Sequence, residues 1–150
     1  MGWFDWLRGG PAPRIEHRRF GPVRASVRSI DREWLWETLA LVDTAAGQMD
    51  MTFDANEAGP GERHERQLDQ IVANRDALTR SAAPLIEREL SDFLGKPLPD
   101  NPWDELELKF VHLSGRDGEF EMAFSCKSWP DASITAYFEQ GRPTVIQIDD

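Results

Sequence analysis

Apolar and polar residues alternate along many short segments of the chain, which is typical of β-strands with one buried face. Val23, Ala25 and Val27, for example, alternate with polar residues. Residues 34–41 differ, because apolar side chains occupy both phases, as in a strand covered on both sides. The predicted strands are residues 23–28, 34–41, 49–54, 106–112, 120–126, 134–138 and 146–148.

Glycine-containing turns predict how the later strands pair. Residues 116–118 fit a three-residue hairpin loop that ends on a glycine in the left-handed conformation. With that loop, the apolar faces coincide when Phe110 pairs with Phe124 and His112 pairs with Met122. A second hairpin is predicted through residues 140–142.

Between residues 61 and 95 the apolar repeat changes to that of a helix, with one apolar stripe. Pro84 has no N–H to bond the carbonyl of Arg80, so we expect a kink there or two consecutive helices. Gly95 followed by Pro97 predicts the end of the helix. The stripe consists of Leu68, Ile71, Val72, Leu78, Ala82, Leu85, Ile86, Leu90, Phe93 and Leu94.

Together these elements predict an α+β fold: a mostly antiparallel sheet of about six to eight strands, with one long kinked or split helix packed on it. We expect residues 1–13 to be a short aromatic segment and linker, and residues 14–150 to be a single domain. The first eight residues are too few to be helical alone in water, so a short N-terminal helix must dock on something. Its own domain, a protein partner or second copy, and a membrane surface all stay open, with Trp3, Phe4, Trp6 and Leu7 as the contacts.

Charge is distributed unevenly along the chain, whose net charge is −10. Residues 1–32 hold seven basic and three acidic residues (+7 − 3 = +4), so the other residues sum to −14. An acidic body repels phosphates, and we therefore expect no nucleic-acid partner. The basic arm, with Arg8, Arg14, Arg18 and Arg19, makes a peripheral membrane adaptor an alternative, although the acidic body opposes an anionic surface.

Candidate chemistry is sparse. His64-Glu65 begins like a zinc-binding helix, but Leu68 stands where the second ligand would be, and no metal or cofactor is expected. In the expected register Cys126 and His112 are roughly 13 Å apart along the strands, at about 3.3 Å per residue, too far for a nucleophilic pair. Cys126 is better interpreted as a small buried apolar residue.

The second half of the chain carries a resemblance. Glu105-Leu106-Glu107-Leu108, Asp117-Gly118-Glu119-Phe120 and Trp129-Pro130-Asp131 resemble a family of uncharacterised bacterial α+β domains of unknown function, over about residues 20–150. The resemblance implies a fold and a bacterial source, and no activity. Some small acidic domains of this general kind are suspected immunity or partner-binding proteins, an analogy only.

These observations favour a noncatalytic protein-binding module whose acidic face captures a basic protein partner, in the manner of an immunity or adaptor protein. We expect it in the cytoplasm, because the sequence has one cysteine and no long apolar stretch. An enzyme with a carboxylate site is a further alternative, and the oligomeric state is not indicated. The candidate partner contacts are Trp103, Trp129, Glu107, Glu119 and Glu121.

Overall fold

The computed structural model describes residues 12–28, 34–95 and 97–150. Of these residues 47% are in strands and 26% in helices. The strands are β1 (Arg14–His17), β2 (Gly21–Arg28), β3 (Trp34–Thr38), β4 (Val42–Thr44), β5 (Gly47–Ala55), β6 (Leu106–Leu113), β7 (Phe120–Cys126), β8 (Trp129–Glu139) and β9 (Arg142–Asp149). The helices are α2 (Glu62–Ala73), α3 (Arg75–Leu94) and the short 3-10 helix η1 (Pro102–Asp104).

The fold class expected from the sequence is wrong. The described chain forms one nine-stranded sheet with two separate α-helices, instead of six to eight strands with one long kinked helix. Two of the strands, β1 and β4, have only four and three residues, which is too short for alternation to identify them. The short N-terminal helix that was also expected, with Trp3, Phe4, Trp6 and Leu7, lies outside the described residues.

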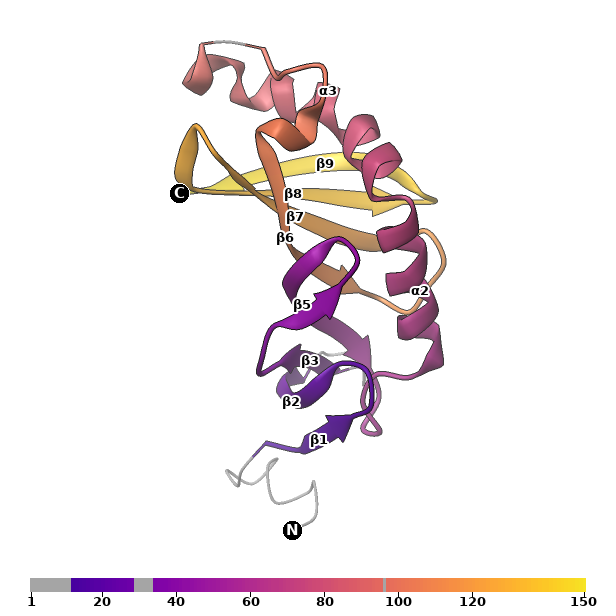
Figure 1. Cartoon of the computed structure of the whole chain (residues 1–150). Coiled ribbons are helices and arrows are strands. Elements are labelled where there is room, and N and C mark those ends of the chain that lie inside the picture. Colours follow the sequence, from indigo (N-terminus) through magenta and orange to yellow (C-terminus); the bar gives the residue numbers. More distant parts are fainter. Residues whose placement is uncertain (1–11, 29–33, 96) are drawn as a thin grey trace.

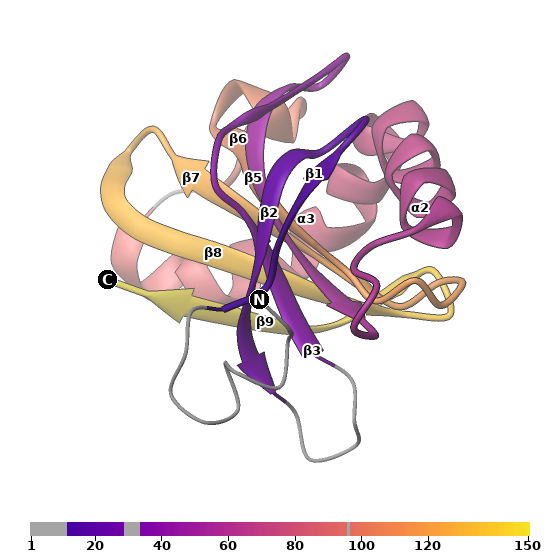
Figure 2. The ribbon, with the colours of Figure 1, turned by 90° about the horizontal axis from the view of Figure 1, so that it is seen from below.

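The sheet is mixed. Its strand order is β1-β2-β3-β5-β6-β7-β8-β9, and β4 pairs with β5. The β5–β6 pair is parallel, whereas the other pairs are antiparallel. Parallel neighbours need a long crossover connection, and α2 and α3 supply it. Both helices run along one side of the strongly twisted sheet, as Figures 1 and 2 show.

The helical region breaks at Asn74, ten residues before Pro84. Asn74 ends α2, where its backbone N–H and its side-chain amide both donate to the carbonyl of Gln70, at 3.0 and 2.8 Å. Pro84 instead lies inside α3. Pro84 and Arg80 are both exposed, so water can replace the hydrogen bond that proline removes from the carbonyl of Arg80.

One apolar core lies between the helices and one face of the sheet. The predicted helical stripe supplies Leu68, Ile71 and Ile86, all buried, which confirms that part of the prediction. Residues 34–41, however, are not one strand, because β3 ends at Thr38. Trp34 and Trp36 are buried in the core, but Leu41 is 56% exposed. Leu35, the residue of the second apolar phase that lies in β3, is half-buried, whereas Leu39 and Leu41 lie beyond the end of the strand.

The register of β6 and β7 differs from the expected one because of a β-bulge. Leu108 pairs with Phe124, but the register then shifts, and His112 pairs with Glu121 instead of Met122. A bulge adds one residue to one strand, and one extra residue sends the following side chains to the opposite face. The expected pairs of Phe110 with Phe124 and His112 with Met122 are therefore wrong. The bulge places His112 on the face of the sheet away from the helices.

Candidate functional site

A shallow groove of about 250 Å³ lies on this outer face of the sheet, across β5, β6, β7 and β8. Four carboxylates line it, against one arginine, Arg116. We call this the acidic groove and define it by Asp54, His112, Glu119, Glu121, Tyr137 and Glu139.

Strand alternation and the bulge bring these residues together. On β5, Thr52 and Asp54 alternate with the buried residues Met51 and Phe53, so they point away from the core. The next three strands continue the row, because Thr52 pairs with His112, His112 pairs with Glu121 and Glu121 pairs with Tyr137. The polar row thus crosses four neighbouring strands.

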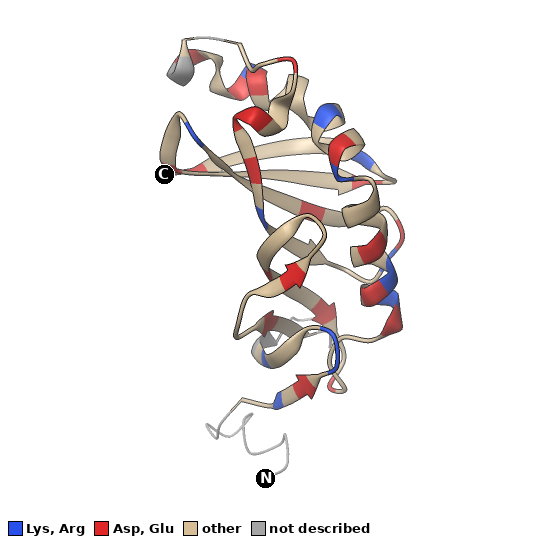
Figure 3. Cartoon of the chain, viewed as in Figure 1, with Lys and Arg blue, Asp and Glu red and all other residues tan. Residues whose placement is uncertain are grey.

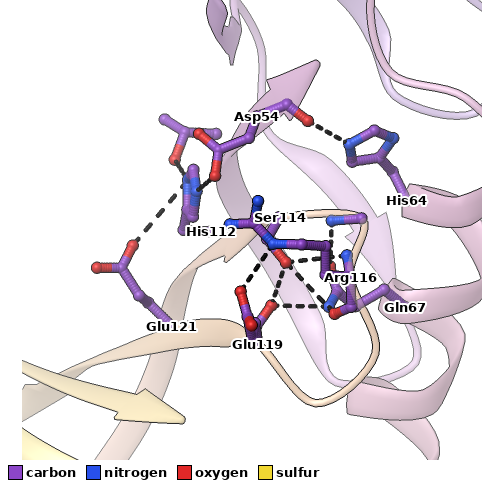
Figure 4. A network of polar contacts seen from close by, with 10 residues as sticks. Asp54, His64, Gln67, His112, Ser114, Arg116, Glu119 and Glu121 are labelled. Carbon is purple, nitrogen blue, oxygen red and sulfur yellow. Dashed lines mark hydrogen bonds and ion pairs between the residues drawn. The ribbon is translucent and has the colours of Figure 1, made fainter. Parts of the chain in front are cut away.

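His112 lies at the centre of a hydrogen-bonded network (Figure 4). Its Nε2 is 3.0 Å from Asp54 Oδ2, and its Nδ1 is 2.6 Å from Thr52 Oγ1. The hydrogen bond from His112 lowers the pKa of Asp54, so this carboxylate is ionised and accepts from Nε2–H. In the neutral imidazole, Nδ1 is then the acceptor, and the Thr52 hydroxyl donates to it.

This order of carboxylate, imidazole and hydroxyl is the one that activates a nucleophile in hydrolases. Here Thr52 is half-buried and is not among the residues that line the groove. The arrangement also does not suit a metal ion, because Asp54 and Glu121 approach opposite ring nitrogens of His112. Within the described residues, no three His, Cys, Asp or Glu side chains are placed to hold a metal.

Tyr137 forms the far wall of the groove. Burial, together with Glu121, raises the pKa of its phenol, which therefore stays protonated. The hydroxyl is 3.0 Å from Gln147 Oε1 and donates to it. Tyr137 thus gives the groove a fixed polar edge with no charge of its own.

Glu119 is positioned by the loop between β6 and β7. Arg116 Nε is 2.7 Å from Glu119 Oε2, and the Ser114 hydroxyl donates to the backbone carbonyl of Glu119. Gln67 of α2 also donates to that carbonyl, at 2.8 Å. The loop is therefore fixed to the helix, as Figure 4 shows.

The other two histidines have structural roles. His64 accepts a hydrogen bond from the N–H of Gly61 at Nδ1, and its Nε2 is 2.7 Å from the carbonyl of Asp54. Burial lowers its pKa, which keeps the ring neutral. His17 Nδ1 accepts from the backbone N–H groups of Arg19 and Phe20, and burial lowers its pKa too.

Only two of the five expected partner contacts lie in the acidic groove, Glu119 and Glu121. Glu107 lies near the start of β6 and pairs with Lys109 at 2.9 Å. Trp103 is in η1, half-buried, with the Arg80 guanidinium 4.9 Å from its ring centre. Trp129 begins β8 and packs against the core. The acidic groove therefore brings together two of the five expected contacts.

The sequence did not single out Asp54 and Tyr137, and it placed His112 on the wrong face. The pattern held a signal for Asp54, which is in the polar phase of a predicted strand. The pattern held no signal that distinguished the Asp54 carboxylate from the many other carboxylates of the chain. Cys126 is buried as predicted, and its thiol donates to Glu105 Oε1 at 3.1 Å. Burial raises the pKa of this thiol, which argues against a nucleophile.

The described part of the basic arm is engaged within the domain. Arg18 pairs with Glu65 at 3.1 Å, and Arg19 pairs with Asp69, so the turn between β1 and β2 is tied to α2. These two arginines each pair with a carboxylate of α2. None of the helices in the described ranges is long and apolar enough to cross a membrane.

Comparison with protein-family models, with curated proteins and with solved structures finds no match to this chain.

Proposed function

We propose that this protein is a noncatalytic binding module whose acidic groove receives an arginine or lysine side chain of a basic protein partner. The observation that carries the proposal is the lining of the groove: four carboxylates and one arginine, on the sheet face that the helices leave open. A cationic group in this groove would gain attraction from several carboxylates at once.

The size of the groove supports a side chain as the ligand. Sites for whole small molecules usually measure about 300–1,000 Å³. The groove measures about 250 Å³ and is open, so a partner would insert one residue and rest the remainder of its surface on the sheet around it. Val145, 56% exposed on the neighbouring edge strand β9, offers apolar area for that contact.

The hydrogen bonds around His112 support binding over catalysis. Thr52 and Asp54 hold the ring from both sides, which fixes Asp54 before any ligand arrives. Preorganised groups lose less conformational entropy when they bind. The position of Thr52 outside the groove lining disfavours hydrolysis. A cytoplasmic location is part of the proposal, since the free thiol of Cys126 fits a reducing compartment.

The test is a titration of the full chain with a hexapeptide of alternating arginine and glycine. Isothermal titration calorimetry measures the affinity, and NMR of the histidine and tyrosine rings locates the binding. We expect saturable binding that shifts His112 and Tyr137 and weakens with salt. Glu121→Gln should weaken it about three- to tenfold, as for loss of one partly screened ion pair.

Glu107→Gln is the matched control. It removes the same charge from the same sheet, but Glu107 does not line the groove. General attraction between a basic peptide and an acidic protein predicts equal losses for both variants, whereas the groove predicts a loss for Glu121→Gln alone. Equal losses, or binding that leaves the His112 and Tyr137 signals in place, would refute the proposal.

A further inference from the structure

A second hollow, of about 600 Å³, lies on the other side of Arg116, between α2 and the loop that joins β6 and β7. Three arginines line it, Arg63, Arg66 and Arg116, against a single acidic residue, Asp117. We call it the arginine hollow. Such a cluster is unexpected on a chain with a net charge of −10.

The sequence of α2 separates its charges onto two flanks. Arg63 and Arg66 are three residues apart, so they are neighbours on one flank of the helix. Glu65 and Asp69 lie on the other flank, where they pair with Arg18 and Arg19. Figure 3 shows basic segments on the first turns of α2, close to the loop between β6 and β7.

Gln67, 5% exposed, holds this loop against α2. Its amide nitrogen donates to the carbonyls of Arg116 and Glu119, at 2.7 and 2.8 Å, and its amide oxygen accepts from the N–H of Gly115 at 3.0 Å. Gly115 permits the close approach, because a Cβ there would lie 2.9 Å from His64 Nε2. The backbone of the loop that carries Arg116 is thus held against α2, which carries Arg63 and Arg66, before any ligand binds.

Two of the three arginines in the hollow have no ion-pair partner among the described residues. Arg63 and Arg66 form no ion pair with any residue that the structure describes. Arg116 does pair, with Glu119. Guanidinium groups held close together repel one another, and an anion that bridges them removes this repulsion.

We infer that the arginine hollow binds the phosphate group of a small molecule. Guanidinium groups match phosphate oxygens with paired hydrogen bonds. The volume suits a molecule of metabolite size. A long polyanion is disfavoured, because Asp54 and Glu62 border the adjoining hollow and the body of the protein is acidic. This inference does not depend on the basic partner proposed for the acidic groove.

Pyrophosphate is the probe. Titration of the full chain with pyrophosphate at low salt, monitored by calorimetry and by phosphorus NMR, should show saturable binding. Arg66→Gln and Arg63→Gln should each weaken it at least about tenfold, the loss expected for a charge-assisted hydrogen bond. The control Arg88→Gln removes the same charge from an exposed position of α3 and should change the affinity less than about twofold. Urea denaturation curves that match those of the wild type will establish that the variants are folded.

Three results would overturn the inference. The first is a lack of saturable pyrophosphate binding at low millimolar concentration. The second is an equal loss with Arg88→Gln, which would assign the binding to general charge. The third is tighter binding of a single-stranded oligonucleotide than of pyrophosphate, which would point to an extended polyanion. Partial rescue by Arg66→Lys, which keeps the charge but not the paired geometry, would support the guanidinium role.

Discussion

Asp54 holds two histidines through two different groups. Its backbone carbonyl accepts from His64 on α2, and its carboxylate accepts from His112 on β6. One residue of β5 therefore joins the first turn of the helix to the neighbouring strand. The carboxylate bond can be removed without the carbonyl bond, which makes Asp54→Asn an informative change.

We predict that Asp54→Asn lowers the free energy of unfolding at pH 7 by about 1 kcal/mol relative to Asp50→Asn, because a charge-assisted hydrogen bond becomes a neutral one. Asp50 is an exposed residue of the same strand, so the control corrects for net charge. Urea denaturation measures both values. Equal free energies for the two variants at pH 7 would contradict the role given to His112.

The pH dependence follows from the sign of the pKa shift. His112 lowers the pKa of Asp54 in the folded state below its ordinary value of 3.8. A lowered folded pKa gives stability that is fully present above the unfolded pKa and is lost as the pH falls through the folded one. The difference in free energy of unfolding between the wild type and Asp54→Asn should therefore become smaller as the pH falls below about 4.

Some single residues could be assigned from the sequence and others could not. Gly118 and Cys126 were predicted correctly, since a hairpin loop demands a left-handed residue and a lone apolar-phase thiol favours burial. His112 was not, because its face depends on one inserted residue nearby. Asp54 could not be chosen at all, because only the fold shows which carboxylate a histidine contacts.

At the scale of elements, two hairpin turns touch each other. The loop between β6 and β7 meets the turn between β8 and β9, where the N–H of Gly141 donates to the carbonyl of Gly118 at 3.1 Å. Both glycines have positive φ, +75° and +74°. The two glycines differ in the room that they leave for a side chain. A Cβ on Gly118 would lie 2.8 Å from the backbone nitrogen of Gly141, whereas a Cβ on Gly141 would meet nothing within 4 Å.

This difference gives a matched pair of substitutions. Gly141→Ala should lower the free energy of unfolding by about 1 kcal/mol, because alanine is strained in the left-handed conformation. Gly118→Ala adds a backbone clash and should cost about 1–3 kcal/mol more. Thermal or urea unfolding of both variants measures the gap. Comparable losses for the two would mean that the contact between the turns has no energetic weight.

Element type was easier to predict than element geometry. The alternating strands and the helical stripe are present, because burial of one face dictates those periods. The bulge was hidden by the adjacent apolar residues Phe110 and Val111, which fit either phase. The helix break was assigned to Pro84, but an exposed proline can stay within a helix. Nothing in the pattern identified Asn74 as the junction.

At the scale of the whole molecule, Cys126 reports on the opening of the sheet. It is 1% exposed on β7, a strand with partners on both sides. We predict that a thiol reagent labels native Cys126 slowly, at a rate that rises with urea in parallel with global unfolding. Fast labelling in native buffer would show local opening of β7 instead.

The single parallel pair has a consequence for the order of folding. β1 to β5 and β6 to β9 are each built from antiparallel neighbours close in sequence, except where β5 meets β6. That seam joins residues such as Thr52 and His112, which are 60 positions apart. Closing a loop of this length costs roughly 3–4 kcal/mol of chain entropy. Contacts between β5 and β6 are therefore expected to form late in folding. The hydrogen bonds of His112 to Thr52 and Asp54 are among these late contacts.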